Sequence, residues 1–218
     1  AGTHVVRALT NKMRGRSECD LQVKGTEGYI GGIAGESKKH ETLNIQPAID
    51  QCVMNGKVDG SDGITGAGGI VGYAENTILN NNYVYGAVEG SSVAGSLGGV
   101  IFAGVRGENN FYLDGTSIDV VGYDDQGNFG NYSSFSGSGN QVIMSSPVNG
   151  VNNLTRALND WVRAQGDTYY RTWRSDLTGT ENNGYPIFGA PDIIPVFDTV
   201  YSSSCDFYEW KNILLTES

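Results

Sequence analysis

The sequence is poor in the residues from which most catalytic and metal sites are built. It has two histidines and three cysteines in 218 residues, and neither His4 nor His40 stands in an H-E-x-x-H motif. A G-x-S-x-G nucleophile motif and a phosphate-binding G-x-x-x-x-G-K-[ST] loop are both missing. We therefore expect no catalytic residue, no cofactor and no metal site in this chain. His40, which lies in a charged stretch, is expected to be solvated.

Positive charge and long apolar runs are scarce as well. The net charge is -10; residues 1–146 hold 9 basic and 15 acidic residues, and residues 147–218 hold 5 and 9. Nucleic acid and anionic lipid need a basic surface, so neither is an expected partner. No apolar run approaches the roughly 18 residues of a membrane span, and residues 1–10 lack the plan of a signal peptide. If the protein is exported, we expect its signal upstream of residue 1.

Glycine, in contrast, is abundant and unevenly distributed. Residues 1–146 hold 27 of the 32 glycines, and residues 147–218 hold 5. This drop in glycine content after residue 146 marks a domain boundary. We expect a glycine-rich repeat domain over 1–146, a helix-plus-strand unit over 147–190, and a linker over 191–218.

Two phrases recur within the first of these domains. A Gly-Gly phrase occurs as GGIAGE, GGIVGY and GGVIFA, beginning at Gly31, Gly68 and Gly98. A second phrase places four residues at one position of the repeat: Cys19, Cys52, Tyr83 and Phe111. A period near 30 predicts a mainly β fold, a short parallel β-helix or β-solenoid of about four coils.

The stretch from Ile64 to Val93 illustrates the predicted unit. We expect one strand over Gly68–Ala74, a second over Thr77–Gly90, and a polar corner at Asn80–Asn82. Alternation puts Tyr83, Tyr85 and Ala87 on one face of the strand and Val84, Gly86 and Val88 on the other. The Gly-Gly pairs are expected where a side chain has no room, and asparagine at corners is expected to adopt left-handed geometry. Segments Ser37–Ala48 and Val121–Ser146 break the repeat and are expected to form a protruding loop and an irregular last coil or long loop.

The C-terminal third contains the strongest helix signal. Leu154, Leu158, Trp161 and Val162 form one apolar stripe, with Asn152 or Asn153 as N-cap and Gly166 after the last turn. Strands are expected at Tyr169–Trp173 and Tyr185–Phe188. We interpret Pro147–Gly189 as a small α+β cap on the C-terminal end of the solenoid. Trp161 is expected in the core, and one of the adjacent Tyr169 and Tyr170 is expected to be exposed.

The phrase GGIVGYAENTILNNNYVYGAVEG resembles the GLUG-type repeat of bacterial surface proteins, over roughly residues 15–120. Such repeats occur in large secreted adhesins and beside the protease domain of some IgA-specific metallo-endopeptidases. The ending SSSCDFYEWKNILLTES resembles the opening of Cys-Asp-x-Tyr-x-Trp surface repeats, which implies a further module in the parent protein. The resemblance implies an extracellular, cell-surface location.

Carboxylates on successive coils form a separate candidate site, because parallel β-helices can cleave sugars with such pairs. The four acidic residues near equivalent corners are Glu27, Asp59, Asp62 and Glu89. Acidic residues in Gly/Ser turns are usually solvated turn formers, so we do not assign them to catalysis. For calcium, Asp124 and Asp125 are the most suitable pair, although no D-x-[DN]-x-[DN]-G loop is present. Cys19 and Cys52 are expected as stacked apolar residues, with a disulfide left open, and Cys205 lacks an obvious partner.

The sequence therefore favours a non-catalytic fragment of a large secreted bacterial surface protein, an adhesin or stalk segment. Its expected partners are host glycans, glycoproteins or other modules of the same protein, with Ser37–Ala48 and Val121–Ser146 as the expected contact loops. Two alternatives remain open: an accessory domain of an extracellular hydrolase, and a carbohydrate-binding module. The last alternative requires an aromatic cluster on a solvated face and fails if the alternating tyrosines are all buried.

Overall fold

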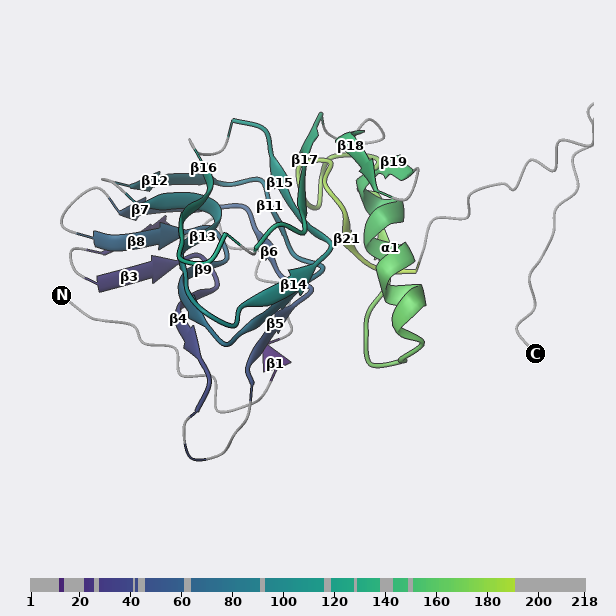
Figure 1. Cartoon of the computed structure of the whole chain (residues 1–218). Coiled ribbons are helices and arrows are strands. Elements are labelled where there is room, and N and C mark those ends of the chain that lie inside the picture. Colours follow the sequence, from purple (N-terminus) through teal and green to yellow (C-terminus); the bar gives the residue numbers. More distant parts are fainter. Residues whose placement is uncertain are drawn as a thin grey trace, which may run out of the picture.

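Figure 1 shows the computed structural model of the chain, in which strands from successive repeats lie side by side. The residues that the structure describes are 12–13, 22–25, 28–40, 42, 46–60, 64–90, 93–115, 119–127, 129–137, 143–148 and 151–190. Within them the fold is mainly β, with parallel sheets, which is consistent with the predicted β-helix or solenoid class.

Four sheets make up the body of the molecule. Sheet I contains β1 (Lys12–Met13), β5 (Ala48–Asp50), β10 (Ile78–Asn80) and β14 (Arg106–Glu108). Sheet II contains β6 (Val53–Met54), β11 (Tyr83–Val84), β15 (Asn110–Leu113), β17 (Tyr132–Ser136), β18 (Ile143–Val148) and β19 (Val151–Asn153). Sheet III contains β2 (Gln22–Lys24), β7 (Lys57–Gly60) and β12 (Ala87–Gly90). Sheet IV contains β3 (Gly28–Gly31), β4 (Ala34–Lys38), β8 (Ile64–Gly68), β9 (Val71–Glu75), β13 (Ala94–Ile101) and β16 (Asp119–Asp124).

The chain visits these sheets in a fixed order. From β8 and β9 in sheet IV it passes to β10, β11 and β12 in sheets I, II and III, and it returns to sheet IV at β13. Leu79 pairs in parallel with Ile49 of the preceding repeat and with Gly107 of the next, so equivalent positions of three repeats lie in one row. This confirms the stacking of repeats predicted from the sequence.

Alternating side chains separate an interior core from an outer face. Val84 and Val88 belong to the interior cluster, together with Ile49, Ile70 and Ile101 from other strands. Tyr83, one residue from Val84, belongs to a second apolar cluster on the other side of sheet II. Tyr83 and Val84 therefore face opposite sides of sheet II, as predicted, and both sides are covered. The prediction of one strand over Thr77–Gly90 was wrong, because this stretch is divided into β10, β11 and β12, which lie in three different sheets.

The alignment of the recurring phrases needs two corrections. Tyr83 pairs with Phe111 as predicted, but its partner in the preceding repeat is Val53, not Cys52. Cys52 lies one position earlier, where its backbone N–H donates to the side-chain oxygen of Asn82 at 2.8 Å. A shift of one residue along a strand turns the side chain to the opposite face. The second correction concerns the third Gly-Gly phrase, because Gly68 pairs with Gly95 and Val71 pairs with Gly98.

The glycines themselves occupy places where a side chain does not fit. Gly31–Gly32 and Gly68–Gly69 lie at a corner, so the strand predicted over Gly68–Ala74 is split into the end of β8, a bend and β9. A Cβ on Gly68 would lie 2.0 Å from the carbonyl oxygen of Val71, and one on Gly69 would lie 2.1 Å from that of Ser96. The prediction that these positions leave no room for a side chain is confirmed.

Polar residues line the corner between sheets I and II. Gln51, Asn81 and Asn109 follow one another in successive repeats, with left-handed φ values of 55°, 54° and 58°. Asn82 and Asn110, which follow Asn81 and Asn109, form hydrogen bonds inside the stack. The Asn82 amide donates to the Asn110 side-chain oxygen at 3.0 Å and to the Ile49 carbonyl at 2.9 Å. Asparagine tolerates left-handed geometry and supplies these hydrogen bonds, as the sequence predicted for Asn80–Asn82.

Residues 151–190, which we call the C-terminal unit, contain α1 (Leu154–Gln165), β20 (Trp173–Arg174) and β21 (Ile187–Phe188). The helix matches its prediction closely: Asn153 is the N-cap, Gly166 is left-handed with φ 60°, and the predicted apolar stripe is buried. The strand predicted over Tyr169–Trp173 is shorter than expected, because Tyr169 and Tyr170 lie in a turn. Tyr169 is 66% exposed, whereas Tyr170 packs edge-on against Trp161 at 4.7 Å, so the prediction of one exposed tyrosine is confirmed.

The C-terminal unit packs against the outer face of sheet II (Figure 1). Leu154, Leu158 and Trp173 share a buried cluster with Tyr83 and Phe111, which lie in two successive repeats. Reciprocal hydrogen bonds also join the Gln51 side chain to the backbone of Arg171, at 2.6 and 3.0 Å. The unit thus covers a side of the stack, while β18 and β19 extend sheet II beyond its last parallel strand.

The segments predicted as loops are partly strands. β4 continues to Lys38, so strand structure covers the first two residues of Ser37–Ala48. In the second segment, β16 and β17 pair in parallel with β13 and β15, which favours the irregular coil over the long loop. Phe129, between these strands, is 4% exposed and belongs to the interior core.

Candidate functional site

Four aromatic side chains lie in a strip on the outer face of sheet IV. Tyr29 and Tyr73 have ring centroids 4.8 Å apart, and Tyr73 stacks on Phe102 at 6.3 Å. Val100 pairs with Tyr73 on one side and with Tyr123 on the other. Tyr123 therefore lies in the same row as Tyr73, two repeats further along the stack. Phe102 and Tyr123 are 38% and 50% exposed, so this strip contains two of the large apolar side chains that face solvent. We call these four residues the aromatic strip.

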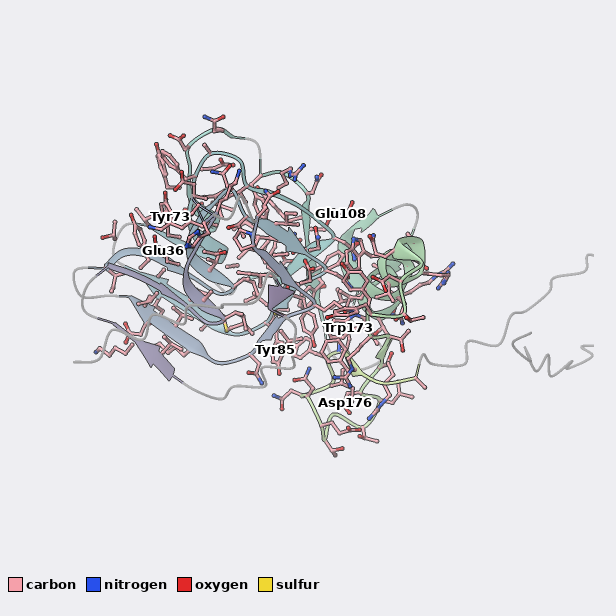
Figure 2. The ribbon with its side chains drawn as sticks, turned by 90° about the horizontal axis from the view of Figure 1, so that it is seen from below. Glu36, Tyr73, Tyr85, Glu108, Trp173 and Asp176 are labelled. Atoms are coloured by element: carbon pink, nitrogen blue, oxygen red, sulfur yellow. The ribbon has the colours of Figure 1, made fainter. Side chains whose placement is uncertain are left out.

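Carboxylates border the aromatic strip. Glu36 pairs in register with Tyr73, and Figure 2 shows the two side chains close together. The Tyr73 hydroxyl donates to Glu75 at 3.1 Å, and the Tyr123 hydroxyl donates to Asp125 at 3.3 Å. The same Tyr-x-acid spacing therefore recurs in two repeats and ties a carboxylate to a ring in each.

The Tyr73 hydroxyl is held in its protonated form. Partial burial is the main cause, and the hydrogen bond to Glu75 and the charge of Glu75 add to it, so the pKa of Tyr73 rises to about 12 from 10.0. The hydroxyl is therefore a hydrogen-bond donor at any physiological pH.

This pKa gives a test of the strip's geometry. Because the folded-state pKa is raised, the unfolded chain ionises first, and stability is lost as the pH rises from about 10 to 12. We expect the wild type to lose up to about 2 kcal/mol more than Tyr73→Phe over this window. Urea unfolding at pH 8, 10 and 11 would measure the difference. Equal losses in both proteins would show that the pKa of Tyr73 is not raised, which would contradict the burial of its hydroxyl as well as the hydrogen bond to Glu75.

The chemistry of the aromatic strip suits binding to uncharged or cationic groups. Aromatic rings contact the apolar faces of sugars and attract cations, while carboxylates accept hydrogen bonds from hydroxyl and ammonium groups. Tyr29 and Tyr73 cover part of each other's ring, so the ring surface available to a ligand lies mainly on the more exposed Phe102 and Tyr123.

The boundary with the C-terminal unit holds a buried polar network. The Tyr83 hydroxyl donates to the carbonyl of Pro186, and the Asn182 amide donates to the Tyr83 hydroxyl at 2.9 Å. The Tyr85 hydroxyl donates to the Asn182 side-chain oxygen at 2.5 Å, and the rings of Tyr85 and Tyr185 stack at 4.0 Å. All of these groups are paired with one another, so the network fixes the unit to sheet II and leaves none of these donors for a ligand.

Asp176 organises the loop that supplies Asn182 (Figure 2). One carboxylate oxygen accepts the backbone N–H groups of Glu181, Asn182 and Gly184 at 3.1, 2.7 and 3.1 Å, and the other accepts that of Gly179 at 3.0 Å. Burial by itself would raise the pKa of the Asp176 carboxyl, but these donors outweigh it and hold the pKa below its ordinary value. Asp176 was not among the predicted site residues, because a lone aspartate before a Thr-Gly turn is a weak signal in a sequence.

The acidic residues considered for sugar cleavage fall into two groups. Asp59 and Glu89 pair in register on β7 and β12, as the sequence suggested. Lys57 forms an ion pair with Glu89 at 2.8 Å, and Lys24 lies 3.9 Å from Asp59, so both carboxylates are neutralised on the surface of sheet III. Glu27 and Asp62 lie outside the described residues.

The pair considered for calcium has a structural role. The Asp124 carboxylate accepts the backbone N–H groups of Gln126, Gly127 and Phe129 at 3.2, 3.0 and 3.0 Å. These bonds place Phe129 in the interior core, and Asp125 is turned toward Tyr123. No group of three or more metal-binding side chains occurs among the residues the structure describes.

The remaining residues singled out in the sequence lie apart from the aromatic strip. His40 is exposed, as expected, and Cys52 is buried. His4, Cys19, Cys205 and the linker predicted over 191–218 lie outside the described residues. No helix in the described ranges has the length and apolar character needed to span a bilayer.

Comparisons with protein-family models, with curated proteins and with solved structures find no match to this chain.

Proposed function

We propose that this chain is a non-catalytic segment of a secreted bacterial surface protein, in which it acts as an adhesive or stalk module. The observation that carries the proposal is the aromatic strip, an outward-facing row of rings and carboxylates on a sheet built from stacked repeats. A stack of this kind is stiff along its axis, because each repeat is hydrogen-bonded to its neighbours. It can hold a binding face away from the cell and present a tyrosine with a carboxylate in more than one repeat.

We further propose that the stack is a β-solenoid of about four coils related to GLUG-type repeats, with residues 147–190 as a cap on the outer face of sheet II and not on the end of the stack. The support is the resemblance of the phrase GGIVGYAENTILNNNYVYGAVEG and the parallel pairing of Leu79 with equivalent positions in both neighbouring repeats. The acidic net charge of -10 favours solubility at an exposed surface. The accessory role beside an extracellular hydrolase is a variant of this proposal, with the chemistry located outside this chain.

Carbohydrate binding is the second candidate, and the aromatic strip favours it. The alternating tyrosines Tyr83 and Tyr85 are covered by the C-terminal unit, so binding through them is not part of this proposal. The exposed Phe102 and Tyr123 are the binding residues instead, because their rings are the ones that a sugar could stack on.

The experiment is binding of the purified chain to an array of host glycans and matrix glycoproteins. We expect selective binding that weakens by about tenfold in Phe102→Ala and in Tyr123→Ala, since each removes one stacking ring. Tyr169→Ala is the matched control, because Tyr169 is also an exposed aromatic residue but lies on the C-terminal unit. Binding that is equally weakened by all three variants would remove the aromatic strip from the proposal. A complete absence of binding would leave the stalk role alone.

A further inference from the structure

Phe102 is an exposed ring of the aromatic strip, and an acidic residue lies on either side of it along the stack. Ile101 pairs with Ala74, and the Phe102 N–H donates to the Ala74 carbonyl at 2.8 Å, so the next residue of β9, Glu75, lies beside Phe102. On the other side, the Asp125 N–H donates to the Ile101 carbonyl at 3.0 Å, which places Asp125 beside Phe102 as well. Three successive repeats therefore present a carboxylate, a ring and a carboxylate in one row.

Tyrosine hydroxyl groups hold both carboxylates on the face that carries the rings. The Tyr73 hydroxyl donates to one oxygen of Glu75, and the Tyr73 ring itself stacks on Phe102. The Tyr123 hydroxyl donates in the same way to one oxygen of Asp125. Because a carboxylate has room for about four hydrogen bonds, both groups keep acceptor sites for a ligand.

Within the described ranges, neither of these carboxylates is neutralised by an ion pair. Lys38 is the register neighbour of Glu75 on β4, and it forms an ion pair with Glu36 at 2.7 Å. On sheet III, in contrast, the carboxylate of Glu89 is paired with a lysine at 2.8 Å. A positively charged ligand would therefore meet negative charge on both sides of Phe102.

A ring between two carboxylates is suited to an ammonium group. An aromatic face attracts a cation that lies within about 6 Å of the ring centroid, and carboxylates accept charge-assisted hydrogen bonds from the same cation. Phe102 is 38% exposed, so its ring is accessible to such a group. The ring also offers apolar surface, which favours a ligand that combines positive charge with an apolar face.

The position of Phe102 distinguishes a sugar from a peptide as the ligand. A peptide strand adds to the open edge of a sheet through backbone hydrogen bonds, but β13 already pairs with β9 on one side and with β16 on the other. A ligand over β13 must therefore be held by side chains alone. An amino sugar can be held in this way, because its C–H face packs on an aromatic ring while its ammonium group contacts a carboxylate beside that ring.

We propose that the aromatic strip binds sugar chains whose rings carry free amino groups, with Phe102 as the contact ring and Glu75 and Asp125 as the acceptors of the ammonium groups. This assignment rests on the carbohydrate-binding role proposed above and adds the class of sugar to it. One competing explanation is a neutral sugar, which needs no carboxylates. The other is a general attraction of cations by the net charge of -10.

Calorimetric titration of the 218-residue chain with matched probes distinguishes these explanations. One probe is a hexamer of β-1,4-linked glucosamine, and the other is the same hexamer with every amine acetylated, both at about pH 6 so that free amines carry their charge. We expect the amine form to bind about tenfold more tightly, and high salt to reduce this preference because exposed charges are screened. A hexamer of lysine, which has the charge without the sugar rings, should bind more weakly than the glucosamine hexamer.

Variants of the two carboxylates then locate the preference. Glu75→Gln and Asp125→Asn should each lower it about threefold, and the double variant about tenfold, because each change removes one charge and keeps the size of the side chain. Glu89→Gln is the matched control, because Lys57 already pairs with that carboxylate, and it should leave the preference unchanged. The preference is a ratio of two affinities measured on one sample, so partial unfolding of a variant does not imitate its loss.

The outcomes separate this assignment from the proposed function. Equal binding of the two sugar hexamers would overturn the amino-sugar assignment and leave carbohydrate binding by the strip intact. A preference that survives in the double variant, or a lysine hexamer that binds as tightly as the glucosamine hexamer, would show general attraction of cations and also overturn it. If neither sugar hexamer binds, the assignment is wrong, and the glycan array decides whether the strip binds another sugar or none.

Discussion

Gly72→Ala is expected to destabilise the stack strongly, although it adds only one methyl group. The added Cβ would lie 2.6 Å from both the nitrogen and the oxygen of Ile30, and 2.7 Å from the oxygen of Gly35. These atoms belong to the backbone of paired strands, so they cannot move aside as a flexible side chain would. We expect a loss of about 3–5 kcal/mol in the free energy of unfolding, or failure to fold. Urea unfolding followed by far-ultraviolet circular dichroism measures it.

Gly130→Ala is the matched control for this prediction. Among the described residues, no atom lies within 4 Å of a Cβ built on Gly130, and its backbone is not among the left-handed glycines. The same chemical change should therefore leave stability within about 1 kcal/mol of the wild type, or raise it slightly by restricting the unfolded chain. If Gly72→Ala and Gly130→Ala had equal effects on stability, the packing of the strands would not require glycine at position 72.

The glycines of sheet IV also explain why the fold class could be predicted from the sequence. They explain as well why the predicted alignment of the repeats was wrong. A period near 30 and a high glycine content are enough to predict stacked repeats. The third Gly-Gly phrase, however, marks a different position: Gly99 belongs to the row of Gly72, while Gly95 and Ser96 take the places of Gly68 and Gly69. The Gly-Gly dipeptide therefore occurs at two different positions of the repeat. A side chain is excluded both at the corner and where neighbouring strands lie close together.

The error at Cys52 has a similar origin. Cys52 and Tyr83 each follow a polar pair in the sequence, but the residue opposite Tyr83 is Val53. The two repeats keep the same spacing through this corner, with Asp50 opposite Asn80 and Val53 opposite Tyr83, so Cys52 takes the place of Asn82. An alignment that matches the polar pairs therefore slips by one residue. A slip of one residue assigns interior side chains to the outer face of the sheet and outer side chains to the interior.

The helix could be predicted in detail because its signals are local. Asn153, the apolar stripe and Gly166 are contiguous in sequence, and each acts within one or two turns. The aromatic strip could not be found in this way, because Tyr29, Tyr73 and Phe102 come from three repeats and only the register brings their rings together. From the sequence alone, Tyr83 and its neighbours on the same face are equally suitable for binding, and only the structure shows that the C-terminal unit covers them.

Asp176→Ala is expected to release the C-terminal unit from sheet II. The carboxylate accepts four backbone N–H groups and the Thr178 hydroxyl, and the residue is 1% exposed. Removing it leaves these N–H groups without their acceptor, and because those of Asn182 and Gly184 are buried, the loss costs about 3 kcal/mol or more. The loop that it shapes carries Asn182, so the bonds from Asn182 to Tyr83 and Tyr85 should be lost as well.

Asp176→Asn tests the charge separately from the size of the side chain. The amide keeps one acceptor oxygen, but its NH₂ group faces N–H donors that the carboxylate accepted, so we expect most of the loss seen with alanine. The lowered pKa of Asp176 adds a pH dependence: its contribution is present above the unfolded pKa of an aspartate and is lost as the pH falls through the lower folded value. The difference in stability between wild type and Asp176→Asn should therefore narrow in acid.

Glu181→Gln supplies the control in the same loop. Glu181 forms two hydrogen bonds with Arg174, at 2.6 and 2.7 Å, but both side chains are partly exposed, so their ion pair contributes less than about 1 kcal/mol. Hydrogen exchange of residues 176–190 and the fluorescence of buried Trp173 report whether the unit has detached. Detachment in the two Asp176 variants but not in Glu181→Gln would show that one buried carboxylate fixes the unit to the stack. If the unit stays attached in all three variants, the apolar cluster around Tyr83 and Trp173 holds it to sheet II without help from the loop.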